Sequence, residues 1–544
     1  MRRPALRRFE SLEPRLALAG LVTFSDVDGD TVTVRTSRGT DVLLSAALTL
    51  VPAGVAGGFQ LQQVSLFHPS FAGTNLAITA RPSATGGNGR VDVGEILTSF
   101  DLGTVTVGGD LGRIIAGDRI RATPGVAAFA SVSIGSRGTA TGSPNTSSLV
   151  TGTVPSIRVA GDLVAARFVV AGRAADVVIG GSIFGTNGAD GFEANAIGQL
   201  VVGGGVFGGT QDDSGRVLSR AGISRVVIRG DLIGGNGIAS GVVISGGPIG
   251  FARIGASITG GGGENSGAVV AGGTGITRLV VGGAIIGGSN QLSGRVYVTG
   301  SIGSAVVGGS IVGGGGLLSG IVSAGAGIGT IEIGGDLIGG VGPASGAVSA
   351  GGGIGTLRVN RIFAGDGPLS GYLGARSLGT IVVRGDISGS FLQPVVIAAP
   401  GAATPTGPRA IGSLTVGGTM SKTLVLGGYS GTTPVNGAAR IGAVIVRGNM
   451  FGSSIVAGIE NIGAAVPSGM PQFGDGLDLS IAGGRGSRID SLVVNGAALG
   501  PTDPAESSGV LANSIGSVRL GGRNYTATRA GITPTSGNLR FRVI

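Results

Sequence analysis

Short runs of alternating apolar and polar residues recur along the chain, separated by glycine-containing turns. A run such as Ile331-Glu332-Ile333 is bounded by Gly-Gly, Gly-Asp or Gly-Ser pairs. Successive side chains of a β-strand point to opposite faces, so alternation with a period of two is typical of strands, and glycine pairs are typical of turns. The pattern disfavours helices and predicts short strands joined by tight turns.

Two sequence motifs repeat with the same spacing. The first motif starts with an aliphatic residue, which is followed by a residue that is usually Gly, by any residue, and then by Φ-x-Φ, where Φ is apolar. It begins at Ile197, Ile223, Ile249, Ile276, Ile302, Ile328 and Ile354. The second, Ser-Gly-x-Φ, begins at Ser214, Ser240, Ser266, Ser293, Ser319, Ser345 and Ser370. Both recur every 25 to 27 residues, most often every 26. Because two independent motifs share one period, the chain contains a repeat of about 26 residues.

A unit of this length with about three short strands cannot close a core of its own, but stacked coils pair each strand with the coils above and below. We therefore predict an all-β protein whose body is a parallel β-helix (β-solenoid) with about 26 residues per coil. Sixteen coils, about 4.8 Å apart, would form a rod roughly 75 to 80 Å long. The residues expected to form an inward column are Val105, Val132, Ile157, Val177, Leu200, Val226, Ala252, Leu279, Ala305, Ile331, Leu357, Ile381, Leu414, Val444, Leu492 and Val518, and the residues two positions further on should form a second column.

Changes in composition and spacing divide the chain into three parts. We expect a targeting segment at residues 1–20, a small β domain or cap at 21–95, and the solenoid at 96–544 with irregular loops after residue 390. The motif spacing grows to 33 between Leu378 and Ile411 and to 48 between Ile441 and Ile489, where one irregular coil is predicted. Residues 391–410 and 427–440 are the predicted protrusions.

Composition excludes several classes of protein. Gly supplies 115 of 544 residues without the strict three-residue period of collagen, and 42% of residues are apolar, which disordered chains are not. Cys is absent, so disulfides and thiolate metal sites are excluded. A net charge of +9, scattered Arg and no Trp do not indicate nucleic-acid binding. Residues 296–331 carry no charge, but their frequent glycines argue against a membrane span.

The amino terminus has features of an export signal. Four arginines lie in the first eight residues and a small-x-small sequence ends at Ala19, although Arg15 shortens the apolar run. The string from Phe9 to Leu18, FESLEPRLAL, resembles the LEPR-x-L-L motif of large glycine-rich proteins of planctomycete-type bacteria, with Ala17 or Leu18 at the last Leu. This resemblance implies a secreted or cell-surface location and no known activity.

One acidic segment has the residues of a metal site. Asp26, Asp28 and Asp30 alternate around Gly29, and carboxylates at this spacing suit a hard cation such as Ca²⁺. The segment is not an EF-hand loop, because the twelfth position is Ser37 rather than Glu; it resembles the openings of extracellular cadherin-like bacterial repeats. A calcium site and a solvated acidic turn both fit this pattern, and no other cofactor is expected.

No set of residues has the pattern of a catalytic site. The turn aspartates Asp110, Asp162, Asp231, Asp336 and Asp386 should share one corner of the solenoid without ever lying on adjacent coils. The only histidine, His68, precedes the solenoid, so a Ser-His-Asp triad is not expected in it. Two Arg-Gly-Asp strings, at 229–231 and 384–386, fall at this same corner, where Asp suits a turn and an adhesive role need not be invoked.

The central outward residue of the main strand is apolar in half of the predicted coils: Val178, Val201, Val227, Val280, Val306, Val382, Ile445 and Val493. A covering loop or domain, contact with another copy or a cell-wall component, and simple strand preference all fit this valine face. We expect a non-catalytic structural or adhesive protein, secreted or at the cell surface; the alternative is a polysaccharide-active β-helix enzyme, a lyase or glycoside hydrolase.

Overall fold

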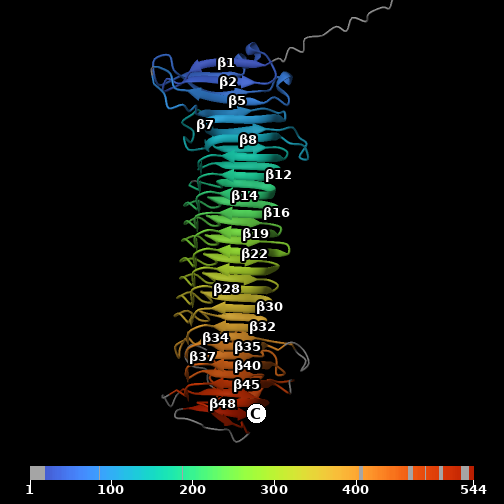
Figure 1. Cartoon of the computed structure of the whole chain (residues 1–544), viewed down its shortest axis with the longest axis vertical. Helices are drawn as coiled ribbons and strands as arrows, with labels where there is room; N and C mark the ends of the chain where they lie inside the picture. Colours follow the sequence, from blue (N-terminus) through green and yellow to red (C-terminus); the bar gives the residue numbers. More distant parts are fainter. Residues whose placement is uncertain are drawn as a thin grey trace, which may run out of the picture.

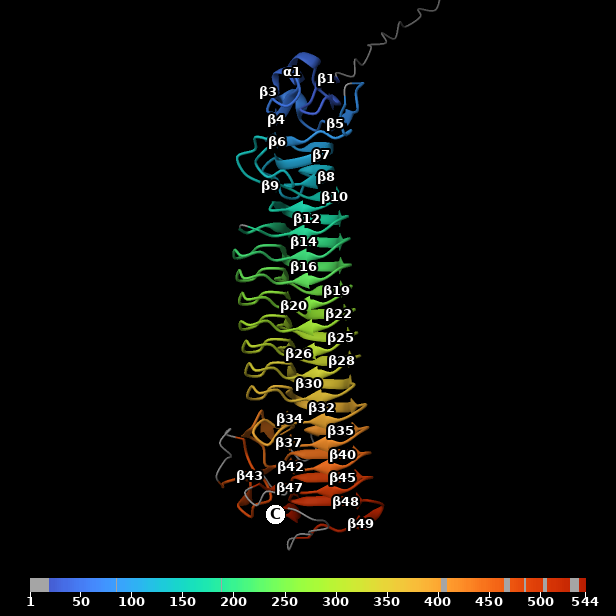
Figure 2. The same cartoon turned by 90° about the vertical axis from the view of Figure 1, so that its left-hand side faces the viewer.

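The computed structural model is a β-solenoid rod, as the repeat predicts (Figures 1 and 2). It describes residues 19–84, 86–186, 188–402, 409–463, 470–483, 486–501, 506–528 and 538–544. Strands hold 54% of the chain and helices 2%, and parallel coils about 26 residues apart form about 16 turns. Within the described residues, no helix is long and apolar enough to cross a membrane.

Each regular coil contributes strands to three faces. Face A holds the Φ-x-Φ motif in the strands β7 (Leu102–Ala116), β8 (Val126–Ile134), β10 (Val154–Val159), β12 (Arg167–Ile179), β14 (Gly191–Val202), β16 (Arg216–Ile228), β19 (Ile249–Ile254), β22 (Gly275–Val281), β25 (Ser301–Val307), β28 (Ile328–Ile333), β30 (Ala347–Val359), β32 (Leu373–Val383), β35 (Ile411–Val416), β40 (Arg440–Val446), β45 (Arg488–Val494) and β48 (Ser514–Leu520).

Face B consists of two-residue strands, and face C of strands that precede the next face A strand. Face B holds β11 (Leu163–Val164), β13 (Ile183–Phe184), β15 (Val206–Phe207), β17 (Leu232–Ile233), β20 (Ile258–Thr259), β23 (Ile285–Ile286), β26 (Ile311–Val312), β29 (Leu337–Ile338), β31 (Ile362–Phe363), β33 (Ile387–Ser388), β36 (Met420–Ser421), β41 (Met450–Phe451) and β46 (Ala498–Leu499). Face C holds the first halves of β12, β14, β16, β30 and β32 together with β9 (Ser147–Val150), β18 (Val242–Ser245), β21 (Ala268–Ala271), β24 (Arg295–Val298), β27 (Ile321–Ala324), β34 (Val395–Ala399), β37 (Thr423–Gly427), β42 (Ser454–Ala457), β47 (Ser508–Ala512) and β50 (Leu539–Val543).

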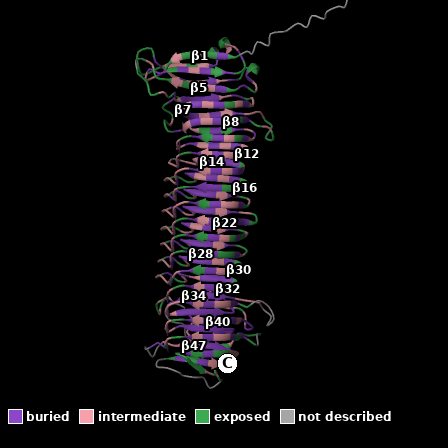
Figure 3. Cartoon of the chain, in the orientation of Figure 1, coloured by how far each residue is buried: buried purple, intermediate pink, exposed green. Residues whose placement is uncertain are grey.

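The inward column of face A follows the predicted order with one error. Ile331 pairs with Ala305 on one side and Leu357 on the other, and all three are buried. The position predicted for Val132 is occupied by Phe129, which pairs with Val105 and Ile157. Val-Ser-Ile at 132–134 has the Φ-x-Φ pattern, but it leads toward face B, where Ile134 pairs with Leu163. Figure 3 shows buried and part-exposed positions alternating along the strands of the stack.

The glycine-rich loop between faces B and C is closed by hydrogen bonds of a serine that recurs from coil to coil. In this loop the Ser319 hydroxyl donates to the Gly316 carbonyl (2.7 Å) and accepts from the Gly314 N–H (3.0 Å). The equivalent serines of six other coils are also buried: Ser214, Ser240, Ser266, Ser293, Ser345 and Ser370. Gly346 shows why glycine follows the serine, since its φ is +61° and a Cβ would lie 1.9 Å from the Ile338 carbonyl oxygen.

The long spacings after residue 390 are insertions between adjacent coils. Ile441 pairs directly with Ile489, so the predicted irregular coil between them is absent. The extra residues include the hairpin of β43 (Ile459–Asn461) and β44 (Asp478–Ser480). The predicted protrusion at 391–410 contains β34, a regular strand of face C, and 427–440 contains the hairpin of β38 (Tyr429–Ser430) and β39 (Thr433–Pro434). The motif spacing alone does not distinguish an extra coil from a long insertion.

The amino-terminal strands lie at one end of the rod (Figure 2). The strands β1 (Gly20–Ser25), β2 (Thr31–Thr36) and β5 (Leu76–Arg81) pair antiparallel, and β5 continues in parallel onto β7. Beside them lie α1 (Asp41–Ala46), β3 (Leu48–Pro52), β4 (Phe59–Ser65), the short 3₁₀ helix Pro69–Phe71 and β6 (Val93–Leu97). This arrangement covers the open strand edge of the first coil. At the other end, β49 (Arg523–Tyr525) pairs antiparallel with β48.

Candidate functional site

The three acidic residues of the candidate metal site form the turn between β1 and β2. One carboxylate oxygen of Asp26, Oδ1, accepts the backbone N–H groups of Asp28 (3.3 Å), Gly29 (3.1 Å) and Asp30 (2.8 Å). This is the local bonding for which Asp is favoured in turns. The Asp26 side chain therefore stabilises the turn through Oδ1. Its other carboxylate oxygen, Oδ2, takes no part in these three hydrogen bonds.

Asp30 connects the turn to a loop about 60 residues away in the sequence. Its Oδ2 accepts the N–H groups of Asn88 (3.1 Å), Gly89 (2.7 Å) and Arg90 (3.1 Å). The Asp30 residue is completely buried. The loop of residues 86–90 is thus held against the turn by one carboxylate, a contact that the spacing of the aspartates could not predict.

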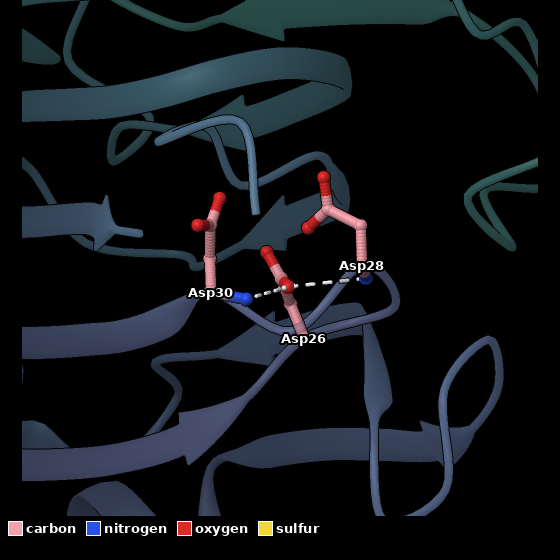
Figure 4. Close-up of side chains that lie close together, drawn as sticks. All are labelled: Asp26, Asp28 and Asp30. Atoms are coloured by element: carbon pink, nitrogen blue, oxygen red, sulfur yellow. Dashed lines mark hydrogen bonds between the residues drawn. The ribbon is translucent and has the colours of Figure 1, made fainter. Parts of the chain in front are cut away.

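The three carboxyl groups are brought together on one side of the turn (Figure 4). One oxygen of each lies within 4.8 Å of the others. Burial raises the pKa of Asp26 to about 6, with a further contribution from the neighbouring Asp28 carboxyl group. Asp28 Oδ1 and Asp30 Oδ1 are shielded from solvent and have no hydrogen-bond partner. The arrangement offers a set of oxygen donors suited to a hard cation.

The turn aspartates of the solenoid serve its backbone. Asp162 Oδ1 accepts the N–H of Ser182 on the next coil (2.7 Å), and Ser310 Oγ accepts the N–H of Asp336 in the same way (3.0 Å). The register places Ser133 between Asp110 and Asp162, and Arg361 between Asp336 and Asp386. The prediction that these aspartates never occupy adjacent coils is confirmed.

Both Arg-Gly-Asp strings belong to this corner. Asp231 Oδ1 accepts the Ser257 N–H (2.9 Å), and Asp386 Oδ1 accepts the Thr419 N–H (2.7 Å). Each aspartate therefore has the same structural role as the corner residues of other coils. This bonding accounts for the two strings without a ligand.

A cleft of about 390 Å³ lies where the amino-terminal region meets the first coils. Its lining includes the carboxylates Asp92, Asp110 and Asp162 and the side chains of Arg90 and Arg137. Burial raises the pKa of Asp110, although hydrogen bonds from Ser133, Arg137 and Ser136 oppose the rise. Arg137 pairs with Asp92 at 2.9 Å. The repeat pattern does not predict this cleft, because Asp92 comes from a segment outside the repeat.

The valine face is only partly shielded. Val306 is 39% exposed and Val227 9%, while the other six of its residues are intermediate. Val227 lies between Val201 and Arg253, and Val306 between Val280 and Glu332, so each has one apolar and one charged register neighbour. Figure 1 shows face A as an open surface along the middle of the rod.

Face B presents a second apolar column, which we call the face B column. The outward residue of its two-residue strands is apolar in ten cases: Val164, Phe184, Phe207, Ile233, Ile286, Val312, Ile338, Phe363, Phe451 and Leu499. All ten are part-exposed. Phe184 and Phe207 stack at 5.0 Å between ring centroids. The apolar–polar alternation does not predict this column, because a strand of two residues is too short to show it.

The expected targeting segment and the LEPR-like string lie almost entirely in residues 1–18, outside the described part of the chain. No protein-family model, curated protein or solved structure matches this chain. What the protein does must therefore be inferred from its own residues.

Proposed function

We propose that the chain is a non-catalytic structural or adhesive rod, secreted or displayed at a cell surface. The observation that supports this function is the use of polar corner residues as backbone acceptors on coil after coil, as in the bonds of Asp162, Asp231 and Asp386 to the following coil. Side chains committed in this way build a regular scaffold. The location rests on the arginine-rich start and the LEPR-like string of residues 9–18.

The outward surfaces suit lateral contact. The valine face is apolar in half of the coils and the face B column in ten, and coils lie about 4.8 Å apart, so a contact made by one coil can recur along the rod. A second copy of the chain has the same spacing, and a cell-wall polysaccharide is the other partner we propose. Apolar surface that is left accessible along a soluble protein commonly marks such contacts.

Sedimentation of the full chain, alone and with insoluble cell-wall polysaccharide, tests this function. We expect concentration-dependent self-association or co-sedimentation of the wild type, and its loss in Val306→Lys on face A or Ile338→Lys on face B. Thr330→Lys is the matched control, because Thr330 is exposed on face A and polar already. A wild-type chain that stays monomeric and does not co-sediment would contradict the proposal.

The cleft at Asp92, Asp110 and Asp162 favours one second candidate, a polysaccharide-active enzyme. Several carboxylates and arginines beside one another are what glycoside hydrolysis or lyase chemistry needs. Release of sugars from acidic polysaccharides, abolished by Asp162→Asn and retained by Asp231→Asn at the same corner outside the cleft, would establish this enzyme and overturn the non-catalytic proposal.

A further inference from the structure

The turn of residues 26–30 is a meeting point of three segments. Besides the bonds from Asp30 to residues 88–90, the Val27 carbonyl accepts the N–H of Val55 (3.0 Å), and Asp26 forms a parallel bridge with Phe59. The turn thus joins the β1–β2 hairpin, the segment before β4 and the loop of residues 86–90. Whatever stabilises the turn fixes all three at the end of the rod.

We propose that Asp26, Asp28 and Asp30 bind one Ca²⁺ ion, which fixes the loop of residues 86–90 to the β1–β2 turn. Asp26 Oδ1 and Asp30 Oδ2 already accept hydrogen bonds from backbone N–H groups. The complementary oxygen of Asp30, Oδ1, is buried with its residue and has no partner. An unpaired carboxylate oxygen shielded from water is costly, and a cation would supply the missing partner.

The charges around the turn support a cation rather than a solvated acidic turn. Three carboxyl groups face one another, and among the described residues no Arg or Lys forms an ion pair with any of them. Asp28 Oδ1 is a second solvent-shielded oxygen without a partner. A solvated acidic turn would instead expose these oxygens to water.

The donor set fits Ca²⁺ in particular. Ca²⁺ takes six to eight oxygen ligands at about 2.3–2.6 Å in flexible geometry, so two ligands on opposite sides lie roughly 4.6–5.2 Å apart. The triad oxygens lie within 4.8 Å of one another. Backbone carbonyls and water can complete such a shell, whereas Mg²⁺ demands a tighter octahedron at about 2.0–2.1 Å and keeps its waters.

The ion would also act on the neighbouring cleft. Asn88 and Arg90 belong to the loop that Asp30 holds, and both line the cleft with Asp110 and Asp162. Fixing the loop therefore sets the position of these two side chains at the cleft. This consequence does not depend on whether the rod binds a polysaccharide or a second copy.

Calorimetric titration of the EGTA-treated, dialysed full chain with CaCl₂ tests the site. We expect the wild type to bind one Ca²⁺ per chain. The affinity should be at least tenfold lower for Mg²⁺, titrated as MgCl₂, and the affinity of Asp28→Asn for Ca²⁺ should also be at least tenfold lower than that of the wild type. Asp28 is the ligand to change, because its carboxylate holds no backbone of the loop, unlike that of Asp30. Asp366→Asn is the matched control, since Asp366 is exposed in a Gly-Asp-Gly turn, and should bind as the wild type does.

Hydrogen exchange on the wild type gives a readout that does not depend on a variant. Ca²⁺ should slow exchange of the amides of residues 88–90 relative to EGTA, and leave the central coils unchanged. Absence of a calcium-dependent heat, equal binding by Asp28→Asn with a wild-type circular dichroism spectrum, or equal exchange of residues 88–90 in both conditions would overturn the proposal.

Discussion

The central coils (residues 191–390) and the C-terminal coils (residues 391–544) share their interior and differ in what covers face C. The inward column passes from Ile381 to Leu414 and Val444 without interruption. In the central coils the outward face C residues, such as Ile244 and Val270, are part-exposed. In the C-terminal coils the outward residues Val396, Leu426, Val456 and Leu511 are buried in a second core, together with Tyr429 and Phe473 from the insertions.

The length of the coil accounts for this difference. In a coil of 26 residues, all residues belong to the three strands, to their corners or to the glycine-rich loop that the buried serine holds by hydrogen bonds. No residues are left to cover face C. The spacings of 33, 30 and 48 residues at Leu378, Ile411 and Ile441 supply the extra chain. The C-terminal insertions cover face C near the end of the rod, at the lower left in Figure 2, as expected of a terminal cap on a solenoid. The central coils retain a repetitive surface for contacts.

The largest expected effect concerns the second core. Tyr429→Ala should destabilise the C-terminal coils by about 3–5 kcal/mol, because it removes a fully buried ring that packs against Phe473 and donates its hydroxyl proton to the Ile459 carbonyl. Hydrogen exchange and limited proteolysis should show opening of residues 427–440, 457–463 and 470–483 while the central coils stay protected.

Tyr297→Ala is the matched variant in the central coils. Tyr297 is an outward, part-exposed residue of face C, and its ring lies beside the Arg295 guanidinium. We expect a loss of less than about 1 kcal/mol, as for other surface contacts. Equal losses for the two tyrosines would show that the insertions do not form a separate core.

The second effect concerns the loop that only the regular coils possess. Ser319→Ala should cost about 1–3 kcal/mol locally, since the Gly314 N–H and the Gly316 carbonyl lose their buried partner. Faster exchange of the Gly314 amide and its neighbours in the adjoining coils is the measurement. Ser304→Ala, on the part-exposed outer side of face A, is the control and should leave exchange unchanged. If Ser319→Ala also accelerated amide exchange in the C-terminal coils, this would contradict the expectation that each coil is stabilised only by its direct neighbours.

The interior of the solenoid could be predicted from the sequence because stacking repeats one local pattern. Ile331 and Leu357 occupy equivalent positions in a fixed period, and this is enough to define their column. The prediction fails at Val132, where the coil spacing changes and the inward positions are held by Phe129 and the polar Ser131, while the Φ-x-Φ match lies three residues later. Nor could the second core be predicted, since Tyr429 and Phe473 meet through folding of insertions that have no period.

The candidate metal site was predictable in its residues and not in its environment. The spacing of Asp26, Asp28 and Asp30 around a glycine is visible in the sequence, and a turn brings such neighbours together. The hydrogen bonds from residues 88–90 to Asp30, which bury it, depend on a contact across the amino-terminal region. Similarly, Asp92 joins Asp110 and Asp162 in the cleft through tertiary structure alone.

The smallest expected effect is a pH dependence of opposite sign in the two regions. Burial would raise the pKa of Glu193 in the central coils, but hydrogen bonds from Arg167 and Arg216 outweigh it and lower the pKa below its usual value. Burial raises the pKa of Asp478 in the C-terminal insertions, although Asn461 and the Gly474 N–H oppose the rise. An acid with a lowered folded pKa stabilises the fold above its unfolded pKa, whereas one with a raised pKa stabilises it below and loses this contribution as pH rises.

Two variants separate these signs. The destabilisation caused by Glu193→Gln should be greatest at pH 7 and shrink as the pH falls through the lowered pKa, because the ion pairs are lost in the wild type as well. The destabilisation caused by Asp478→Asn should change in the other direction, being greatest at low pH and shrinking as the wild-type carboxyl group ionises. Local opening free energies from hydrogen exchange between pH 3 and 7, corrected for intrinsic rates, measure both. Parallel pH profiles for the two variants would mean that the insertions hold their carboxylate as the regular coils do, so that the second core differs from the rest of the rod in packing alone.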